Sequence, residues 1–289
     1  MTRNMEKFME KQQTVAKKVS INGIALHTGV RATLTLNPAP ENTGIIFRRI
    51  DLPGKPEVRA LASNVVDARR GTTIGNEKCA VYTIEHIMSA LHICKIDNCI
   101  VDMDGTEPPI LDGSARGFFD LVKAAGAVEQ DAQALYYEVK TPLYVRHEDT
   151  HIGIFPGDKL HVACTASFVG CPFDPQYFSL DVDVESYERE IAGARTFVNY
   201  SDLHQLIGMG LCKGGSLDAA AIMHNGAIIC KDELRYQNEI VRHKMLDLIG
   251  DLYLCGRRVK GDVMAIKPGH FFNVKLASMM QMQLKDEQN

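Results

Sequence analysis

Two helical periodicities coincide in the stretch Val241–Tyr253. Its apolar residues recur at helical spacing and predict a helix packed against the core: Val241, Met245, Leu248 and Leu252. His243, Asp247 and Asp251 recur every four residues and form a second, polar stripe. One interpretation is a solvated acidic face with a surface histidine. The other is a buried helix whose carboxylates are paired or bind a metal, because unpartnered charges are costly in a core. The stripe alone does not decide between them.

The first half of the chain predicts short strands followed by two helices. Strands are expected at Val15–Ile24, Arg31–Asn37, Gly44–Arg49 and Cys99–Met103. Thr83 is the expected N-cap of a helix with Glu85 and His86 in its first turn, and a second helix is expected at about Ala115–Ala125. The residues through Gln12 are polar and are interpreted as a loose lead-in.

The second half predicts the same order of elements. Strands are expected at Leu135–Val145, His151–Phe155, Lys159–Thr165, Tyr177–Val184, Ala220–Ile229 and Val259–Ile266, with a hairpin signal at Asn225-Gly226. Helices are expected at Glu185–Ala192, Ser201–Gly208 and Phe271–Met282, besides Val241–Tyr253. The small, polar stretch Gly126–Ala134 is the expected domain boundary. We therefore expect an α+β fold with two domains of similar topology, 13–128 and 134–289, each layering a β-sheet against two helices.

Composition narrows the class of protein. The 289 residues are 45% hydrophobic and 24% charged, which is ordinary for a soluble globular protein. The net charge of −4 argues against a general nucleic-acid surface but allows an anionic ligand held by local cations. The eight cysteines form no C-x-x-C pair, which favours free thiols in a reducing compartment. No apolar run is of membrane-spanning length and no signal peptide is evident, so a cytoplasmic protein is expected.

The polar stripe is a candidate metal site. A hydrolytic zinc site needs three protein ligands, an open position for water and a nearby base. His243 and Asp247 supply two ligands from one helical face, and Glu85-His86 offers a third ligand with a carboxylate beside it. For each histidine taken alone, a hydrogen-bonded structural role is the commoner alternative. Iron(II) also suits these ligands.

Several longer motifs identify a family. They are Gly23-x-x-Leu-His-Thr-Gly29, Thr83-Ile-Glu-His86, Glu107-x-Pro-Ile-Leu-Asp-Gly-Ser114, Ala194-Arg-Thr-Phe197, Gly210-Leu-Cys-x-Gly-Gly-Ser216, Arg242-His-Lys-Met-Leu-Asp-x-Ile-Gly-Asp251 and Lys267-x-Gly-His270. In this order, and from about Val15 to Phe272, the chain resembles the UDP-3-O-acyl-N-acetylglucosamine deacetylase family. The resemblance implies a zinc amidase of lipid A biosynthesis that removes acetate from a UDP-linked, 3-O-acylated glucosamine, with its active site in the cleft between the domains.

The resemblance also implies roles for single residues. His86, His243 and Asp247 match zinc ligands, Glu85 the general base, His270 the general acid or cationic stabiliser, and Asp251 its carboxylate partner. Thr196 matches a hydroxyl at the oxyanion, and Lys244 and Lys267 match cations near the phosphates. Phe197, Gly215 and Ser216 are further expected substrate contacts. The alternatives are a salt bridge of Asp251 with Arg242 or Arg257, a capping role for Thr196 and surface positions for both lysines. Phe168 is assigned to core packing rather than to stacking on uracil.

The acyl chain of such a substrate needs an apolar groove. The family forms it with a β-α-β insertion, which corresponds to about 198–221 here, with Leu203, Leu206, Ile207, Met209 and Leu211 as candidate lining residues. Helix-core packing explains the same residues. Lys213 departs from the apolar residue expected at its position, and Gly214-Gly215-Ser216 is interpreted as a tight turn rather than a phosphate loop. We expect a monomer without stable membrane insertion. The alternatives are a zinc hydrolase acting on another amide or ester, and a non-catalytic module with a structural metal.

Overall fold

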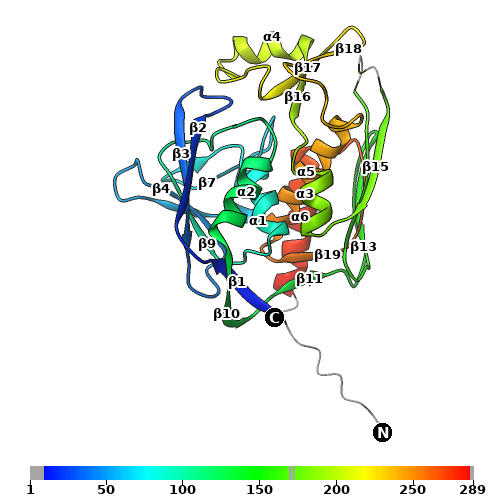
Figure 1. Ribbon diagram of the computed structural model, residues 1–289. Coiled ribbons are helices and arrows are strands. Elements are labelled where there is room, and N and C mark those ends of the chain that lie inside the picture. The colour runs from blue at the N-terminus through cyan, green and yellow to red at the C-terminus, as the bar shows by residue number, and fades with distance from the viewer. Residues whose placement is uncertain (1–9, 169–170, 172, 287–289) are drawn as a thin grey trace.

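The computed structural model describes residues 10–168, 171 and 173–286. Two main β-sheets lie on either side of a central layer of helices, which gives a mixed α+β architecture (Figure 1). The first sheet is formed by the first half of the chain and the second sheet by the second half. The expected α+β class is confirmed.

The first main sheet has five strands in the order β2-β3-β9-β4-β5. Their bounds are Val19–Ile24 (β2), Arg31–Pro38 (β3), Cys99–Met103 (β9), Ile45–Arg49 (β4) and Glu57–Arg59 (β5). In β3, Leu34 and Leu36 are buried and lie opposite Met103 and Val101 of β9. Apolar side chains two residues apart share one face of a sheet, and here that face meets the helices.

The second main sheet repeats this topology. Its order is β12-β13-β19-β14-β15, and the bounds are Leu143–His147 (β12), Thr150–Phe155 (β13), Arg258–Ile266 (β19), Leu160–Ala166 (β14) and Gln176–Asp181 (β15). An additional strand, β11 (Tyr136–Glu138), pairs with β19. In each sheet the last strand in sequence lies in the middle, antiparallel to the second strand and parallel to the third. The expected similarity of topology is therefore present, whereas a division into two domains stays a prediction.

Two helices in each half follow equivalent strands, whereas two more helices occur in the second half alone. The bounds are Glu85–Ile93 (α1), Arg116–Ala125 (α2), Val184–Glu190 (α3), Tyr200–Gly208 (α4), Glu239–Leu252 (α5) and His270–Asp286 (α6), with short 3-10 turns at Ala62–Asn64 and Tyr253–Cys255. α1 and α5 hold the same place in each half, directly before the central strand. They pack on each other between the sheets, and every residue of α1 is buried.

Gly250 permits the close contact of α1 with α5. A Cβ atom at this position would lie 2.1 Å from the carbonyl oxygen of Glu85 and 3.0 Å from the amide nitrogen of Ser89. Both atoms belong to the backbone of α1, so no side-chain rotation relieves the overlap. The sequence therefore sets the distance between the two helices through a missing side chain.

Each half also carries a small sheet between its fourth strand and its first central helix. In the first half these strands are β6 (Val65–Asp67), β7 (Thr73–Gly75) and β8 (Ala80–Val81). In the second half they are β16 (Thr196–Asn199), β17 (Ala220–His224) and β18 (Ala227–Ile229), with α4 crossing between the parallel strands β16 and β17. The predicted β-α-β insertion is thus observed, and Asn225-Gly226 forms the predicted hairpin turn with positive φ at both residues.

Two strand predictions were wrong because each range holds two strands, one of which pairs with a partner distant in sequence. Val15–Ile24 is divided between β1 (Lys11–Val15) and β2, and β1 pairs with β10 (Ala127–Gln133). The expected domain boundary is therefore itself a strand, and Lys11 and Gln12 of the expected lead-in belong to β1. Residues 1–9 of that lead-in lie outside the described residues. Leu135–Val145 is likewise divided, between β11 and β12.

The predicted N-cap of α1 was also wrong. Ile84 is the N-cap residue, and Thr83 has a φ of 53°. The Thr83 hydroxyl donates to the buried carboxylate of Glu107, which also accepts the backbone amides of His27 and Thr28. Tertiary hydrogen bonds to Glu107 thus replace the local cap.

Two predictions from composition have structural counterparts. All eight cysteines are free, as expected for isolated thiols. Among the described residues, no helix combines the length and the apolar character needed to cross a bilayer.

Candidate metal centre and surrounding site

The polar stripe of α5 is buried. The relative exposure of His243 and Asp247 is 2%, and that of Asp251 is 0%. The alternative of a solvated acidic face is therefore wrong. A buried carboxylate is stable only when it is hydrogen-bonded, paired with a cation or bound to a metal. The groups around this stripe therefore show which of these applies.

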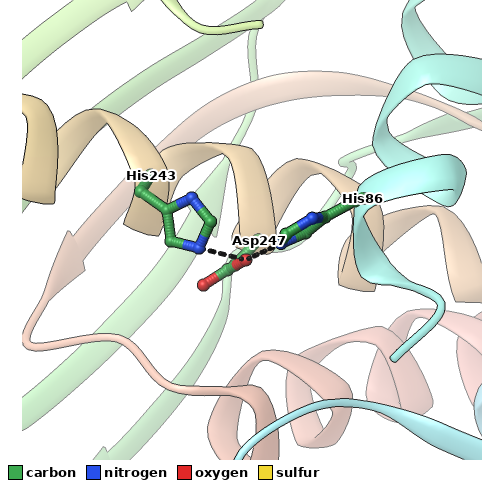
Figure 2. Close-up of side chains that lie close together, drawn as sticks. All are labelled: His86, His243 and Asp247. Carbon is green, nitrogen blue, oxygen red and sulfur yellow. Dashed lines mark ion pairs between the residues drawn. The ribbon is translucent and has the colours of Figure 1, made fainter. Parts of the chain in front are cut away.

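His86 of α1 meets His243 and Asp247 of α5 (Figure 2). Nε2 of His86 lies 3.6 Å from Oδ1 of Asp247, and Nε2 of His243 lies 3.5 Å from the same oxygen. This Oδ1 atom is buried and has no hydrogen-bond partner within the described part of the chain. Two imidazole nitrogens and an unsatisfied carboxylate oxygen that converge in this way form a donor set suited to a divalent transition metal such as zinc. The residues present therefore fit a metal ion.

His243 is held in the form that can bind a cation. Its Nδ1 lies 3.0 Å from the carbonyl oxygen of Ala194, which favours a proton on Nδ1 and a lone pair on Nε2. Burial lowers the pKa of His243 to about 4, so the ring is neutral near pH 7. The adjacent Arg195 forms a buried ion pair with Glu239 at the start of α5, with an Nε–Oε1 distance of 2.8 Å. This ion pair fixes the carbonyl of Ala194 relative to the helix that carries His243.

Glu85 and His270 form a second group beside the first. Nε2 of His270 lies 3.9 Å from Oε1 of Glu85 and 3.8 Å from Oδ2 of Asp247. Burial raises the pKa of Glu85, against the opposing effect of His270 and His86. Burial alone would lower the pKa of His270, but the carboxylates of Asp251, Glu85 and Asp247 raise it to about 9. The site thus pairs a carboxylate of increased basicity with an imidazolium.

Asp251 contacts His270, and its role as the carboxylate partner of this residue stays a prediction. Oδ2 of Asp251 lies 3.0 Å from Nδ1 of His270 and accepts a hydrogen bond from Asn273 at 3.0 Å. Oδ1 of Asp251 accepts the hydroxyl of Thr72 at 2.6 Å. The expected alternative partner Arg242 instead contacts Glu190. Neither Thr72 nor Asn273 was singled out from the sequence, and only the position of Asn273 one turn after His270 could have indicated it.

The two candidate phosphate-binding lysines lie in different surroundings. Nζ of Lys244 is 2.9 Å from Oδ2 of Asp247 and 5.3 Å from the centroid of the Phe197 ring, so its charge lies within the site. Nζ of Lys267 pairs with Asp149 at 2.5 Å, and this side chain is 38% exposed. Their contacts with a substrate stay predictions.

Thr196, Phe197, Gly215 and Ser216 line one cavity of about 300 Å³, together with Leu203, Leu206 and Ile207. The Phe197 ring lies 6.0 Å from the ring of His243, so this cavity adjoins the candidate metal site. Met209, Leu211 and Lys213 instead line a neighbouring cavity of about 780 Å³. The five candidate groove residues are thus shared between two cavities, and Leu206 borders both.

Two further predictions concern residues near these cavities. Phe168 packs against the core and lies 4.7 Å from the Phe197 ring, between centroids. Gly214-Gly215 forms a tight turn, in which the amide of Gly215 donates to the carbonyl of Cys212. Both positions agree with the assignments made from the sequence.

A buried donor set of two histidines and an aspartate, next to a glutamate and an imidazolium, is typical of metal-dependent hydrolases. The sequence profile of the UDP-3-O-acyl N-acetylglycosamine deacetylase family matches residues 12–282. The chain belongs to this family.

Similar proteins named UDP-3-O-acyl-N-acetylglucosamine deacetylase occur in several bacteria. The protein of Geobacter sp. (strain M21) is 42% identical over 267 residues, which cover 92% of this chain and 88% of the relative. The protein of Myxococcus xanthus is 42% identical and is covered to 84%, with 92% of this chain aligned. The protein of Chlamydia pneumoniae is 39% identical, and the alignment covers 91% of this chain and 94% of the relative.

Proposed function

We propose that this protein hydrolyses the 2-acetamido group of UDP-3-O-(3-hydroxyacyl)-N-acetylglucosamine and releases acetate, as an early step of lipid A biosynthesis. Membership of the deacetylase family supports the substrate. The observation that carries the chemistry is the Oδ1 atom of Asp247, which has no hydrogen-bond partner in the described part of the chain and lies near the Nε2 atoms of both His86 and His243. Glu85 and His270 lie beside the same carboxylate group.

His86, His243 and Asp247 would hold a zinc ion. When bound, a divalent cation supplies Lewis acidity, which polarises an amide carbonyl and makes water a better nucleophile near pH 7. Nitrogen and carboxylate donors favour zinc, although iron(II) is compatible with them. Metal analysis of the purified protein distinguishes the two.

Glu85 is the general base of the proposed reaction. Its carboxylate is buried, and burial raises its pKa, which makes it a better proton acceptor than an exposed glutamate. The backbone amide of Thr72 donates to Oε2 at 2.9 Å, so Oε1 is the oxygen directed toward Nε2 of His270. Oε1 takes the proton of the water that attacks the acetamide carbonyl.

His270 is the general acid. With a pKa of about 9 the ring is protonated near pH 7. Asp251 accepts the Nδ1 proton, and the second proton therefore resides on Nε2, beside Glu85 and Asp247. From this position Nε2 stabilises negative charge on the intermediate and delivers a proton to the departing amine, which is a poor leaving group when unprotonated.

The remaining residues bind and orient the substrate. Thr196 and Phe197 line the 300 Å³ cavity, and the Phe197 ring lies 6.0 Å from the ring of His243, which supports a role for both residues in binding the substrate next to the metal site. The apolar side chains of this cavity receive the acyl chain, and Lys244 adds positive charge toward the nucleotide phosphates. We further propose that the protein acts as a cytoplasmic monomer.

The test combines a deacetylase assay with metal analysis. We expect acetate release from the UDP-linked acyl-sugar and none from a simple acetamide, which distinguishes this activity from that of a general zinc amidase. His243→Ala is expected to lose both the metal and the activity. Full activity of His243→Ala would overturn the proposal. A non-catalytic module with a structural metal would instead show no turnover in the wild type.

A further inference from the structure

Thr72 is a buried residue that hydrogen-bonds both to the proposed base, Glu85, and to Asp251, the partner of His270. It precedes β7 in the small sheet of the first half and has a relative exposure of 0%. Its backbone is clamped to the start of α1 on both sides: its amide donates to Oε2 of Glu85 at 2.9 Å, and its carbonyl accepts the amide of Ile84 at 3.2 Å. The peptide of Thr72 therefore moves with the proposed base.

The side chain of Thr72 reaches the other half of the molecule. Its hydroxyl donates to Oδ1 of Asp251, with an oxygen–oxygen distance of 2.6 Å, which is typical of a strong hydrogen bond to a carboxylate. The hydroxyl oxygen of Thr72 also lies 3.5 Å from Nδ1 of His270. Nδ1 is closer to Oδ2 of Asp251, at 3.0 Å, so the imidazole proton is directed to the aspartate.

The hydrogen bonds of Asp251 define one rotamer of its carboxylate. Oδ1 is occupied by Thr72, whereas Oδ2 is shared by His270 and Asn273. With donors on both oxygens the carboxylate cannot rotate without breaking a buried hydrogen bond. Without the hydroxyl of Thr72, Oδ1 has no hydrogen-bond partner among the residues that the structure describes, and the carboxylate can turn away from the imidazole.

Gly71 provides the space for this arrangement. A Cβ atom at position 71 would lie 3.2 Å from Oε1 of Glu85 and 3.4 Å from the hydroxyl oxygen of Thr83. The chain therefore passes close to the proposed base without a side chain, and the next residue supplies the hydroxyl. Close backbone approach to a functional group is a common reason for glycine.

We propose that Thr72 is a positioning residue that sets the orientation of Glu85 and of the Asp251–His270 pair relative to each other. The proposal rests on the proposed function. Glu85 comes from α1 and Asp251 from α5, and Thr72 hydrogen-bonds to both, so it transmits the position of one proton-transfer group to the other. It acts through these side chains and does not itself touch the reacting atoms.

The experiment compares Thr72→Val with Thr72→Ser in the metal-loaded protein. Valine keeps the shape but removes the hydroxyl, whereas serine keeps the hydroxyl. We expect Thr72→Val to lower kcat by about 10–100-fold, as loss of a residue that orients an active-site ligand does, with KM and metal content close to the wild type. Thr72→Ser should retain most of the wild-type kcat.

Thr14→Val is the matched control. Thr14 lies in β1, is buried, and its hydroxyl oxygen accepts the amide of Ala39, so valine again removes one buried hydrogen bond. This variant should lose thermal stability to a similar extent as Thr72→Val but keep its kcat. A kcat of Thr72→Val within about twofold of the wild type, an equal defect in Thr72→Ser or a parallel loss of metal would each overturn the proposal.

A second measurement does not depend on turnover. In protein labelled with ¹⁵N-histidine, the Nδ1 proton of His270 bonded to Asp251 should give a resolved signal. Thr72→Val should shift or broaden this signal, and Thr72→Ser should leave it in place. An unchanged signal in Thr72→Val would overturn the positioning role even if the deacetylase assay of the wild type gave no turnover, an outcome that would separately contradict the proposed function.

Discussion

Replacement of Gly250 by alanine tests whether the contact between α1 and α5 creates the site. The new Cβ atom would lie 2.1 Å from the carbonyl oxygen of Glu85, whereas ordinary van der Waals contact begins near 3.4 Å. Relief of this overlap requires the two helices to separate by about 1 Å, because the atoms of α1 at this point are backbone atoms. The separation moves Glu85 and His86 away from His243 and Asp247.

The magnitude of the effect follows from this displacement. Overpacking of a tight contact costs about 1–3 kcal/mol of unfolding free energy, which exceeds the gain of at most about 1 kcal/mol from replacing glycine by alanine in a helix. Metal–ligand distances tolerate only about 0.2 Å. A displacement of about 1 Å at a reacting group can lower the rate by roughly 10²-fold. We therefore expect Gly250→Ala to fold with reduced stability, to bind metal weakly and to lose activity.

The assay measures the melting temperature, metal content and kcat of purified Gly250→Ala. Gly208→Ala is the matched control, because Gly208 is also in a helix and a Cβ atom there meets nothing within 4 Å. The control should be as stable as the wild type or slightly more stable, with full metal content. Wild-type metal content and kcat in Gly250→Ala would refute the reasoning, because they would show that the site tolerates separation of the helices.

Three further predictions concern proton transfer and protonation. Glu85→Gln should retain the metal but lower kcat by about 10²–10⁴-fold, and a rate near the wild type would exclude Glu85 as the base. The pKa of about 9 for His270 predicts that kcat/KM falls above pH 9 as the ring loses its proton; His270→Gln should be slow and should lack this descending limb. Burial lowers the pKa of His92 to about 4, so folding favours its neutral form. The contribution of this neutral ring to the free energy of unfolding is fully present above pH 6.5 and is lost as the pH falls from 6.5 through 4. This shift corresponds to about 3 kcal/mol, and chemical denaturation of the wild type and His92→Gln between pH 7 and 4 should show a smaller pH dependence in the variant.

The surroundings of His92 explain its preference for the neutral form. Nδ1 lies 3.1 Å from the carbonyl oxygen of Ile249, and Nε2 accepts the amide of Val259 at 3.2 Å. Protonation of Nε2 would remove an acceptor from a buried amide. His92 therefore stabilises the packing of α1 on the second half only while it is neutral.

Residues in regular elements were the easiest to predict from the sequence. The spacing of His243, Asp247 and Asp251 reports a helical face directly, because side chains four residues apart lie together on any α-helix. The apolar periodicity around them left a buried helix and a solvated acidic face open, and the burial of all three side chains in the structure decides for the buried helix. The repeated order of strands and helices likewise follows from local patterns, which explains why the similarity of the two halves was visible without sequence repetition.

Interactions between distant segments could not be read in the same way. The pairing of β1 with β10 joins residues more than 100 positions apart, and the sequence of neither strand indicates which strand it pairs with. Thr83 satisfies the local rules for an N-cap but is recruited by Glu107. Thr72 lies in a stretch of short strands without a long period, and its importance depends on contacts with Glu85 and Asp251 that only the folded chain creates.

Because α1 and α5 occupy equivalent places in the two halves, two glutamates occupy equivalent positions in the fold. Glu85 begins α1 and Glu239 begins α5, and each is 3% exposed. The carboxylate of Glu239 is neutralised by the guanidinium of Arg195 and can only hold structure. Glu85 instead accepts a backbone amide at Oε2, and the imidazolium of His270 lies 3.9 Å from its Oε1, too far for a direct hydrogen bond, so Oε1 is available for its proposed role as proton acceptor. Repetition of a folding unit thus does not repeat the chemical surroundings of its residues, and an arginine introduced beside Glu85 would turn the proposed base into a second structural ion pair.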